Sequence, residues 1–238
     1  MKVGQVLRSD EFCAGQQSAP AISFHMSYEP YEALIAPARS KASILRLIFG
    51  IVITALLYML LLRLSWQVVL QVSGPTWFEQ NMQVPGPSSP SQMFILLGSF
   101  GFMTAAVSFT VWFLHHHSPL ALIGDLARAK GQFLRSAGRL FFIAAGATAI
   151  ANHSETLLPN LPLIQWLVLL PITLAFLFIQ VSAEELVFRG YLQSQLAALG
   201  LHRFVWIMIP SVIFGLLHYD PAVMGAAAPW IVLSTTLF

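Results

Sequence analysis

Long uncharged stretches alternate with polar segments along this chain, a pattern typical of helices that cross a membrane. A helix needs about 20 apolar residues to span the hydrocarbon core, so the first run, Leu47–Leu62, is expected to continue to Val72. The remaining apolar runs are Met93–Leu114, Leu140–Ala151, Leu161–Ala183, Arg203–Tyr219 and a last one that begins near Ala222. Pro210 is expected to kink the helix at Arg203–Tyr219. The pattern predicts an all-α, polytopic transmembrane helical bundle of about six or more spans.

Three polar segments precede or separate these runs. Met1 to about Lys41 contains three prolines, which break any long helix, and residues 1–41 are predicted to be a cytosolic N-terminal tail. Ser73–Gln92 is rich in proline, glycine and serine and is expected to form a loop. Leu120–Arg139 combines five charged residues with apolar residues at an approximate helical period. It is therefore predicted to be an amphipathic helix on the membrane surface.

Lysine and arginine are distributed unevenly between the two sides that this arrangement defines. Ser65–Gln92 and Asn152–Leu161 would both face outside if the N-terminus is in the cytoplasm, and neither contains Lys or Arg. Cytoplasmic loops of membrane proteins carry an excess of these residues. The sequence therefore predicts an integral, multi-pass protein of a bacterial-type plasma membrane. Its N-terminus is expected in the cytoplasm, and Glu184 near the cytosolic side.

Composition supports this class and excludes others. Of the 238 residues, 57% are hydrophobic and only 9% are charged, whereas soluble domains carry about 25% charged residues. The net charge of +2 gives no indication of nucleic-acid binding, so membrane lipid is the expected surrounding partner. The single cysteine, Cys13, excludes an internal disulfide. The histidines at 115–117 lie at a predicted membrane boundary and are expected to be interfacial rather than metal ligands.

The strongest chemical signal is Glu184 with Glu185, which follow more than twenty uncharged residues. Each charge at membrane depth costs about 2.5 to 3.5 kcal/mol, so charges kept there are expected to serve a function. On an α-helix with about 100° per residue, Glu185 and Arg189 lie about 40° apart and are predicted to form an ion pair. Glu184 points to a side shared with Phe188 and Tyr191, where it is expected to face a cavity as a free general base.

A second candidate is Phe214 with His218, near the end of the next apolar helix. The phenyl ring lies one turn before the imidazole on the same face and could hold its orientation. A histidine and a glutamate together can activate a water for attack on a peptide carbonyl. They could equally supply two ligands to a divalent metal such as zinc, with a third ligand still needed. The residues alone leave both alternatives open.

The pattern Glu-Glu-x-x-x-Arg at 184–189, followed by Phe-x-x-x-His at 214–218, resembles the family of CAAX proteases and bacteriocin-processing enzymes (CPBP, also called Abi). Gly190, Tyr191 and Leu192 add to the resemblance, which covers 181–218, about a sixth of the chain. The resemblance implies an all-helical intramembrane endopeptidase, that is, an enzyme that hydrolyses a peptide bond within the membrane.

Carried over residue by residue, the resemblance implies that Glu184 and His218 activate the catalytic water. Glu185 and Arg189 take supporting positions in the same site. Whether a divalent metal such as zinc takes part stays open. The substrate is expected to be a peptide or a membrane protein. The residues expected to contact it are Phe188, Tyr191 and Phe214.

The chain departs from the family in one respect: no histidine follows His218, so the family's further His motif is absent. The last residues, Trp230–Phe238, contain no helix-capping or polar exit signal, and the sequence is interpreted as a fragment. Its transmembrane protease domain (residues 42–238, with core motifs at 181–218) would then lack its C-terminal part. Loss of one oxyanion donor costs about 10²–10³ in rate. A polypeptide of this length is therefore expected to be nearly inactive.

Two other classes of function remain as alternatives. The protein could be a membrane-embedded immunity or scaffold factor, a pseudoprotease that keeps the motifs for packing or peptide binding. A transporter subunit is the weaker alternative, because the sequence contains no paired broken helices and no repeated halves.

Overall fold

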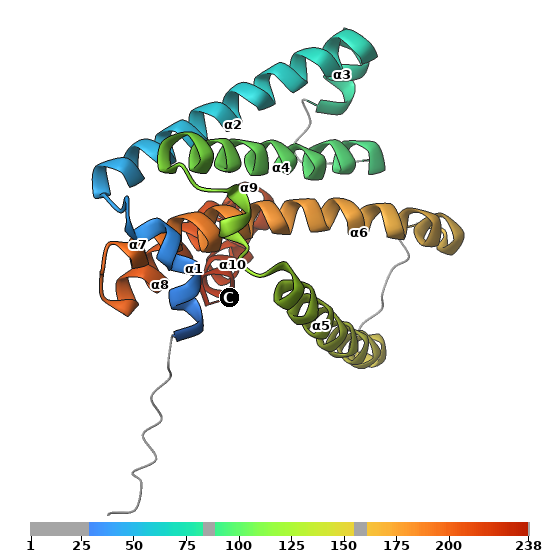
Figure 1. The fold of residues 1–238 in the computed structure, drawn as a ribbon. Coiled ribbons are helices and arrows are strands. Elements are labelled where there is room, and N and C mark those ends of the chain that lie inside the picture. The colour runs from blue at the N-terminus through green and yellow to red at the C-terminus, as the bar shows by residue number, and fades with distance from the viewer. Residues whose placement is uncertain (1–28, 83–88, 155–160, 238) are drawn as a thin grey trace, which may run out of the picture.

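The computed structural model describes residues 29–82, 89–154 and 161–237, and these residues form helices and short connections without a strand. Figure 1 shows α2, α4 and α6 as long helices side by side, with α5 standing apart, α1, α7, α8 and α10 gathered at one end, and the short α3 at the other end beside α2. In chain order the elements are α1 (Glu29–Arg39), α2 (Ile44–Ser73), α3 (Pro75–Met82), α4 (Pro90–Thr110), η1 (Val111–His115), η2 (Pro119–Leu122), α5 (Leu126–Ser154), α6 (Leu163–Glu185), η3 (Leu186–Gln193), α7 (Ser194–Ala198), α8 (Arg203–Leu217), α9 (Pro221–Met224), η4 (Gly225–Ala227) and α10 (Ala228–Leu237).

Four segments in the described part of the chain are long and apolar enough to cross a membrane. A fifth span results if α8 and the helices that follow it, which meet at a bend of 60°, are counted as one. The all-α class and the extension of the first span beyond Leu62 are confirmed. The predicted number of about six or more spans is not. The four segments are Ile44–Ser73, Pro90–His115, Leu126–Ile150 and Leu163–Ala198.

Helix α4 packs between α2 and α6. The buried hydroxyl of Thr54 in α2 donates to Thr110 Oγ1, with the two oxygens 2.8 Å apart. On the other side, a Cβ atom on Gly98 would lie 2.8 Å from the ring of Phe176 in α6. Small residues and hydroxyl groups at such contacts let membrane helices approach closely. They hold α6, which carries the Glu-Glu motif, against the rest of the bundle.

Part of the predicted tail belongs to the folded domain. Residues 29–39 form α1, which packs against α7. Ile35 is only 3% exposed, and the ring of Tyr31 stacks on Trp206 with centroids 5.1 Å apart. A helix of eleven residues is marginal by itself, so these tertiary contacts stabilise it despite Pro37. Residues 1–28 of the predicted tail lie outside the described residues.

The predicted surface helix at 120–139 and the predicted short span at 140–151 form one helix, α5. Asp125 begins it, since its carboxylate accepts hydrogen bonds from the backbone N–H groups of Ala127 and Arg128. No proline interrupts the chain from there to Ser154. The prediction of two separate elements is therefore wrong. The boundary was predicted where the charged residues end and the apolar residues begin, but a change in polarity does not end a helix.

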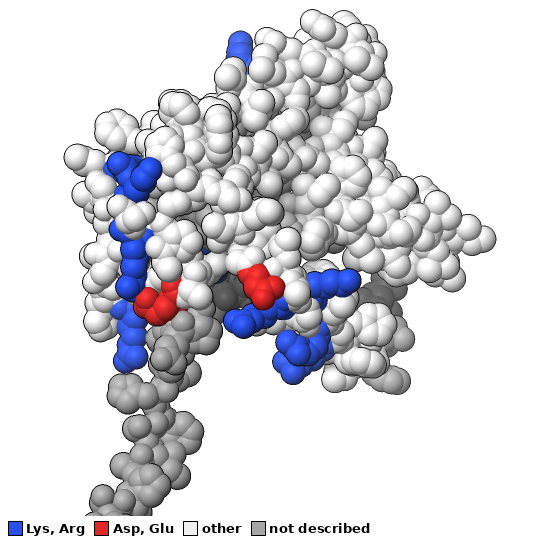
Figure 2. All heavy atoms as spheres, in the orientation of Figure 1, with Lys and Arg blue, Asp and Glu red and all other residues white. Residues whose placement is uncertain are grey.

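Most charged side chains gather on one part of the molecule. Figure 2 shows most of the visible Lys and Arg residues near α1, at the start of α2 and on the first half of α5, with one further basic side chain apart from them at the upper edge, while the visible surfaces of α4 and α6 are uncharged. The apolar surfaces include many large exposed side chains, such as Phe49, Phe142 and Ile164. Exposed apolar surface of this extent marks a contact with lipid or protein.

Candidate active site

The first motif lies where the long helix α6 passes into a π-helix. α6 ends at Glu185, and the π-helix η3 continues from Leu186 to Gln193. A π-helix closes i→i+5 hydrogen bonds, is rare, and occurs frequently at functional sites. The prediction of 100° per residue therefore applies only as far as Glu185. The side chains that follow point in directions that differ from the predicted ones.

Two neighbours stabilise this π-helical segment. The Ser194 hydroxyl donates to the carbonyl oxygens of Gly190 at 2.5 Å and Tyr191 at 3.0 Å. These bonds satisfy backbone acceptors where the helical period changes. A Cβ atom on Gly190 would lie 3.2 Å from both the Cβ atom and the backbone oxygen of Leu122. Glycine at this position therefore lets η3 approach η2 closely.

The two adjacent carboxylates have different surroundings. Glu184 is half-buried, and its Oε1 accepts a hydrogen bond from Gln180 Nε2 at 3.2 Å, one turn earlier on α6. Tyr58 of α2 lies within electrostatic reach of Glu184. Glu185, which is also half-buried, instead lines a cavity between α1, α5, α6 and η3. The sequence predicted that Glu184 would face a cavity. In the structure it is Glu185 that lines this cavity, and Glu184 does not.

Arg189 contacts an aromatic ring rather than a carboxylate. Its guanidinium carbon lies 5.5 Å from the centroid of the Phe214 ring, which is within the range of a cation–π contact. In the described part of the chain no salt bridge joins Arg189 to Glu185, and Arg189 Nη1 is buried there without a hydrogen-bond partner. The predicted ion pair is therefore not formed, because η3 directs Arg189 toward α8.

Phe214 joins the two motifs. Its ring meets the Phe188 ring edge to face, with centroids 5.1 Å apart, and the His218 imidazole, with centroids 4.6 Å apart. Together with the Arg189 contact, one ring touches three of the predicted site residues. The predicted contact between Phe214 and His218 is confirmed. Phe188 and Phe214 are 8% and 9% exposed, so in this structure they pack against other site residues.

The hydrogen bond of His218 determines which of its ring nitrogens is free. Nδ1 lies 2.8 Å from the carbonyl oxygen of Phe214. A carbonyl oxygen can only accept, so Nδ1 carries the proton. In the neutral imidazole, Nε2 then holds a free lone pair, which is the state that a general base or a metal ligand needs. The half-buried ring is therefore oriented by its own helix.

The cavity beside Glu185 has a volume of about 560 Å³. Its charged lining side chains are Glu185, Arg189 and Lys130, and apolar or aromatic side chains form most of the remaining wall. The full lining is Tyr31, Leu34, Leu122, Ile123, Leu126, Ala129, Lys130, Phe133, Phe178, Ser182, Glu185, Leu186, Arg189, Gly190 and Gln193. An apolar cavity with a few convergent polar groups is typical of a ligand site.

Sequence reasoning missed the part that α5 plays in this wall. Leu126, Ala129, Lys130 and Phe133 follow the i, i+3, i+4, i+7 spacing of one helix face. This spacing predicts an apolar face, which the expected surface helix would direct toward the membrane. The structure directs it toward α6 instead, where the rings of Phe133 and Phe178 meet edge to face at 5.4 Å.

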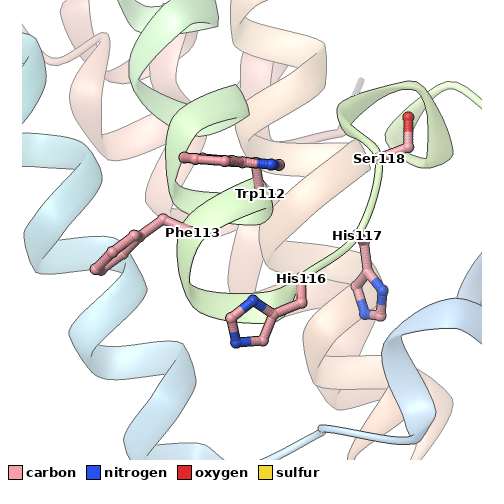
Figure 3. Close-up of a pocket in the computed structure, with 5 residues that line it drawn as sticks. All are labelled: Trp112, Phe113, His116, His117 and Ser118. Carbon is pink, nitrogen blue, oxygen red and sulfur yellow. The ribbon is translucent and has the colours of Figure 1, made fainter.

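The three adjacent histidines differ in their surroundings. His115 ends η1 and is 1% exposed, so it lies in the core and not at the boundary where it was expected. Its Nε2 lies 2.9 Å from the hydroxyl of Tyr191, which is equally buried and does not line the cavity beside Glu185. His116 and His117 line an open cavity of about 430 Å³, and Figure 3 shows both imidazoles projecting away from Trp112.

The described residues do not fit a metal site. Catalytic zinc takes three protein ligands. Among the residues that the structure describes, no three His, Cys, Asp or Glu side chains converge closely enough to hold a metal ion. Glu184, Glu185 and His218 therefore form no zinc site in this arrangement.

Comparison with known proteins finds a similarity to one family, and the matched segment includes both motifs. Residues 165–238 match the family model for the Rce1-like type II CAAX prenyl endopeptidases. The matched segment begins in α6 and includes η3 and α8, so the resemblance to the CPBP family is confirmed for this part of the chain. No curated protein and no solved structure matches the chain. The match and the apolar helices together support an integral membrane protein with a protease-type segment.

Proposed function

We propose that this protein is an intramembrane endopeptidase of the CAAX-prenyl-protease type, in which Glu184 and His218 activate water to hydrolyse a peptide bond. One observation carries the proposal. The ring of Phe214 contacts Phe188 and Arg189 from the first motif and His218 from the second. The family match over residues 165–238 supports the same reaction class.

The proposed reaction uses the orientation of His218. Because Nδ1 donates to the Phe214 carbonyl oxygen, Nε2 can accept a hydrogen bond from the attacking water. The Glu184 carboxylate takes one proton from this water while the water oxygen attacks the peptide carbonyl carbon. When the C–N bond breaks, the same proton passes to the departing amine. Arg189 acts as a positioning residue, since it contacts Phe214 and its Nη1 is buried.

The cavity of about 560 Å³ is the proposed place of substrate binding. Its mainly apolar wall favours a peptide with large apolar side chains, or the membrane-embedded end of a protein substrate. Arg189 and Lys130 supply positive charge at the same wall. The concentration of Lys and Arg near α1 and α5 favours an orientation in which this end of the bundle lies on the cytoplasmic side of a plasma membrane.

The test is a cleavage assay with the full-length protein in lipid nanodiscs. A farnesylated peptide that ends in Cys-aliphatic-aliphatic-X serves as substrate, and mass spectrometry detects the products. We expect Glu184→Gln and His218→Gln to lower kcat by about 10²–10⁴ while the proteins remain folded. Glu79→Gln and His116→Asn, at exposed positions, are the matched controls. Wild-type-like cleavage by either site variant would contradict the proposed roles.

A non-catalytic scaffold or immunity role is the second candidate, and one observation favours it. Glu184 is held by Gln180 on its own helix and does not line the cavity beside Glu185. In that case the wild-type protein would bind the farnesylated peptide without cleaving it, and Glu184→Gln would leave the binding unchanged. If Glu185→Gln abolishes cleavage and Glu184→Gln does not, the enzyme class stands and Glu185 is the general base.

A further inference from the structure

A buried hydrogen bond connects the end of η1, which continues α4, with the π-helix η3 that carries Arg189. The Tyr191 hydroxyl and His115 Nε2 lie 2.9 Å apart, and their rings meet edge to face with centroids 5.4 Å apart. Both residues are 1% exposed. Seventy-six positions separate them in the sequence, so only the tertiary structure brings the two groups together.

The backbone of α2 closes the third side of this contact. A Cβ atom on Gly50 would lie 1.9 Å from the Tyr191 hydroxyl oxygen, so the α2 backbone passes directly over this group. A polar group in such an environment is costly unless it is hydrogen-bonded. The His115 imidazole forms no second hydrogen bond among the described residues, because its Nδ1 is buried without a partner there. The bond to Tyr191 is therefore the polar contact that fixes the orientation of this imidazole.

Both partners belong to π-helical segments. His115 is the last residue of η1, and Tyr191 lies within η3, two positions after Arg189 and three after Phe188. A π-helical segment is rare because the α-helix competes with it. A shift of η3 to α-helical hydrogen bonding would turn Tyr191 away from His115 and leave two buried polar groups unpaired. The contact therefore favours the π-helical form, in which Arg189 lies over Phe214.

We propose that His115 and Tyr191 are positioning residues, whose buried hydrogen bond holds η3 in its π-helical form and thereby holds Arg189 and Phe188 against Phe214. Neither group lines the cavity beside Glu185, so both act through η3. The expected effect on kcat rests on the proposed protease function. The expected effect on the conformation of η3 does not depend on that function.

The experiment compares the full-length protein with Tyr191→Phe and with the double variant His115→Phe/Tyr191→Phe in nanodiscs. Tyr191→Phe removes one hydroxyl, and the double variant removes both polar partners while keeping aromatic rings. Tyr219→Phe, at a position that is 55% exposed, is the matched control. The two readouts are kcat with KM for the farnesylated peptide, and hydrogen–deuterium exchange of the backbone amides at 186–193.

We expect both variants to lower kcat about tenfold with KM unchanged, in line with the loss of one buried hydrogen bond. Exchange at 186–193 should become faster, and exchange in the middle of α6 should not change. Unchanged kcat and unchanged exchange, with only a lower unfolding temperature, would overturn the proposal. If the wild-type protein cleaves nothing, the protease function fails, and the exchange data still decide whether this contact holds η3.

Discussion

The centroids of the His218 imidazole and the Phe214 ring lie 4.6 Å apart at the end of α8, where His218 is the C-cap, and His218 Nδ1 donates to the Phe214 carbonyl oxygen at 2.8 Å. The same phenylalanine therefore orients the imidazole twice, through its ring and through its backbone. Because the backbone bond occupies Nδ1, the nitrogen available for chemistry is Nε2. The reactive state of His218 is thus built into one helix and does not depend on a distant partner.

Phe214→Ala should impair stability and activity together. The ring fills the space between Phe188, Arg189 and His218, and removing a buried phenylalanine side chain costs about 3–5 kcal/mol. The measurement is the free energy of unfolding in detergent by SDS titration, together with kcat. Phe142→Ala, at a position that is 75% exposed, should change the stability by about 0.5 kcal/mol or less. Equal losses in the two variants would show that Phe214 is no more than an ordinary apolar residue.

Arg189→Lys should not preserve function, although it keeps the charge. The guanidinium carbon lies 5.5 Å from the centroid of the Phe214 ring, and lysine lacks the planar, weakly hydrated group that favours such a contact. A cation–π contact at a desolvated position contributes about 2 kcal/mol. A double-mutant cycle with Phe214→Leu, measured by unfolding, should therefore give a coupling energy of about 1–2 kcal/mol. A coupling energy of this size between Arg189 and Glu185, together with none between Arg189 and Phe214, would contradict the observed contact.

Gly215→Ala should destabilise the packing of α8 against α10. The added Cβ atom would lie 1.9 Å from Thr236 Oγ1 and 2.8 Å from the backbone oxygen of Val232. The backbone contact cannot be relieved by a rotamer change, so a cost of about 1–3 kcal/mol is expected. Gly146→Ala in α5 is the matched control, because its Cβ atom would meet nothing within 4 Å. That substitution should stabilise the helix by about 0.5–1 kcal/mol, so the two variants should differ in sign in thermal unfolding.

Stability should decrease on acidification, in part because of His117. Burial lowers the pKa of His117 below 6.5, and the positive charge of Lys41 acts in the same direction. The unfolded state then binds more protons below about pH 6.5, so stability falls as the pH drops from there through the lowered folded-state pKa. The measurement is the unfolding temperature in nanodiscs between about pH 7.5 and pH 5.

His117→Gln should reduce this loss, because glutamine does not titrate in the range. His116→Asn is the comparison variant, since His116 is exposed and its φ of 56° is one that asparagine tolerates. The charge of His116 contributes less to the lowered pKa of His117 than burial and Lys41 do, so this variant should keep most of the loss. An identical dependence on pH in the wild type and in His117→Gln would contradict the assignment.

Several features of this fold could be predicted from the order of residues. The spans at 44–73 and 163–185 follow from the uncharged runs at 47–62 and 161–183, which only a lipid or protein interior can accommodate. The contact of Phe214 with His218 follows from their spacing, since residues four apart on an α-helix are neighbours. The family resemblance of the two motifs is also a property of sequence alone, and the match over residues 165–238 confirms it.

Other features could not be predicted because they depend on neighbours that are distant in the chain. The Glu185–Arg189 ion pair was expected from α-helical geometry, but η3 is π-helical and Arg189 turns to Phe214. The face of α5 that lines the cavity has the expected period, yet its direction depends on the packing of Phe133 against Phe178. The burial of His115 likewise needs Tyr191, which no local pattern could supply.

The sequence by itself therefore determined that this protein has the apolar helices of a membrane protein, and which reactive residues those helices carry. Hydrophobicity and residue identity are local properties, and they alone place the helices in lipid and the Glu, Arg and His groups at helix ends. The tertiary structure decided where those groups point. The π-helix at 186–193 contacts Leu122, His115 and Gly50, which come from three other segments, and a change of helical period redirects every side chain that follows Glu185.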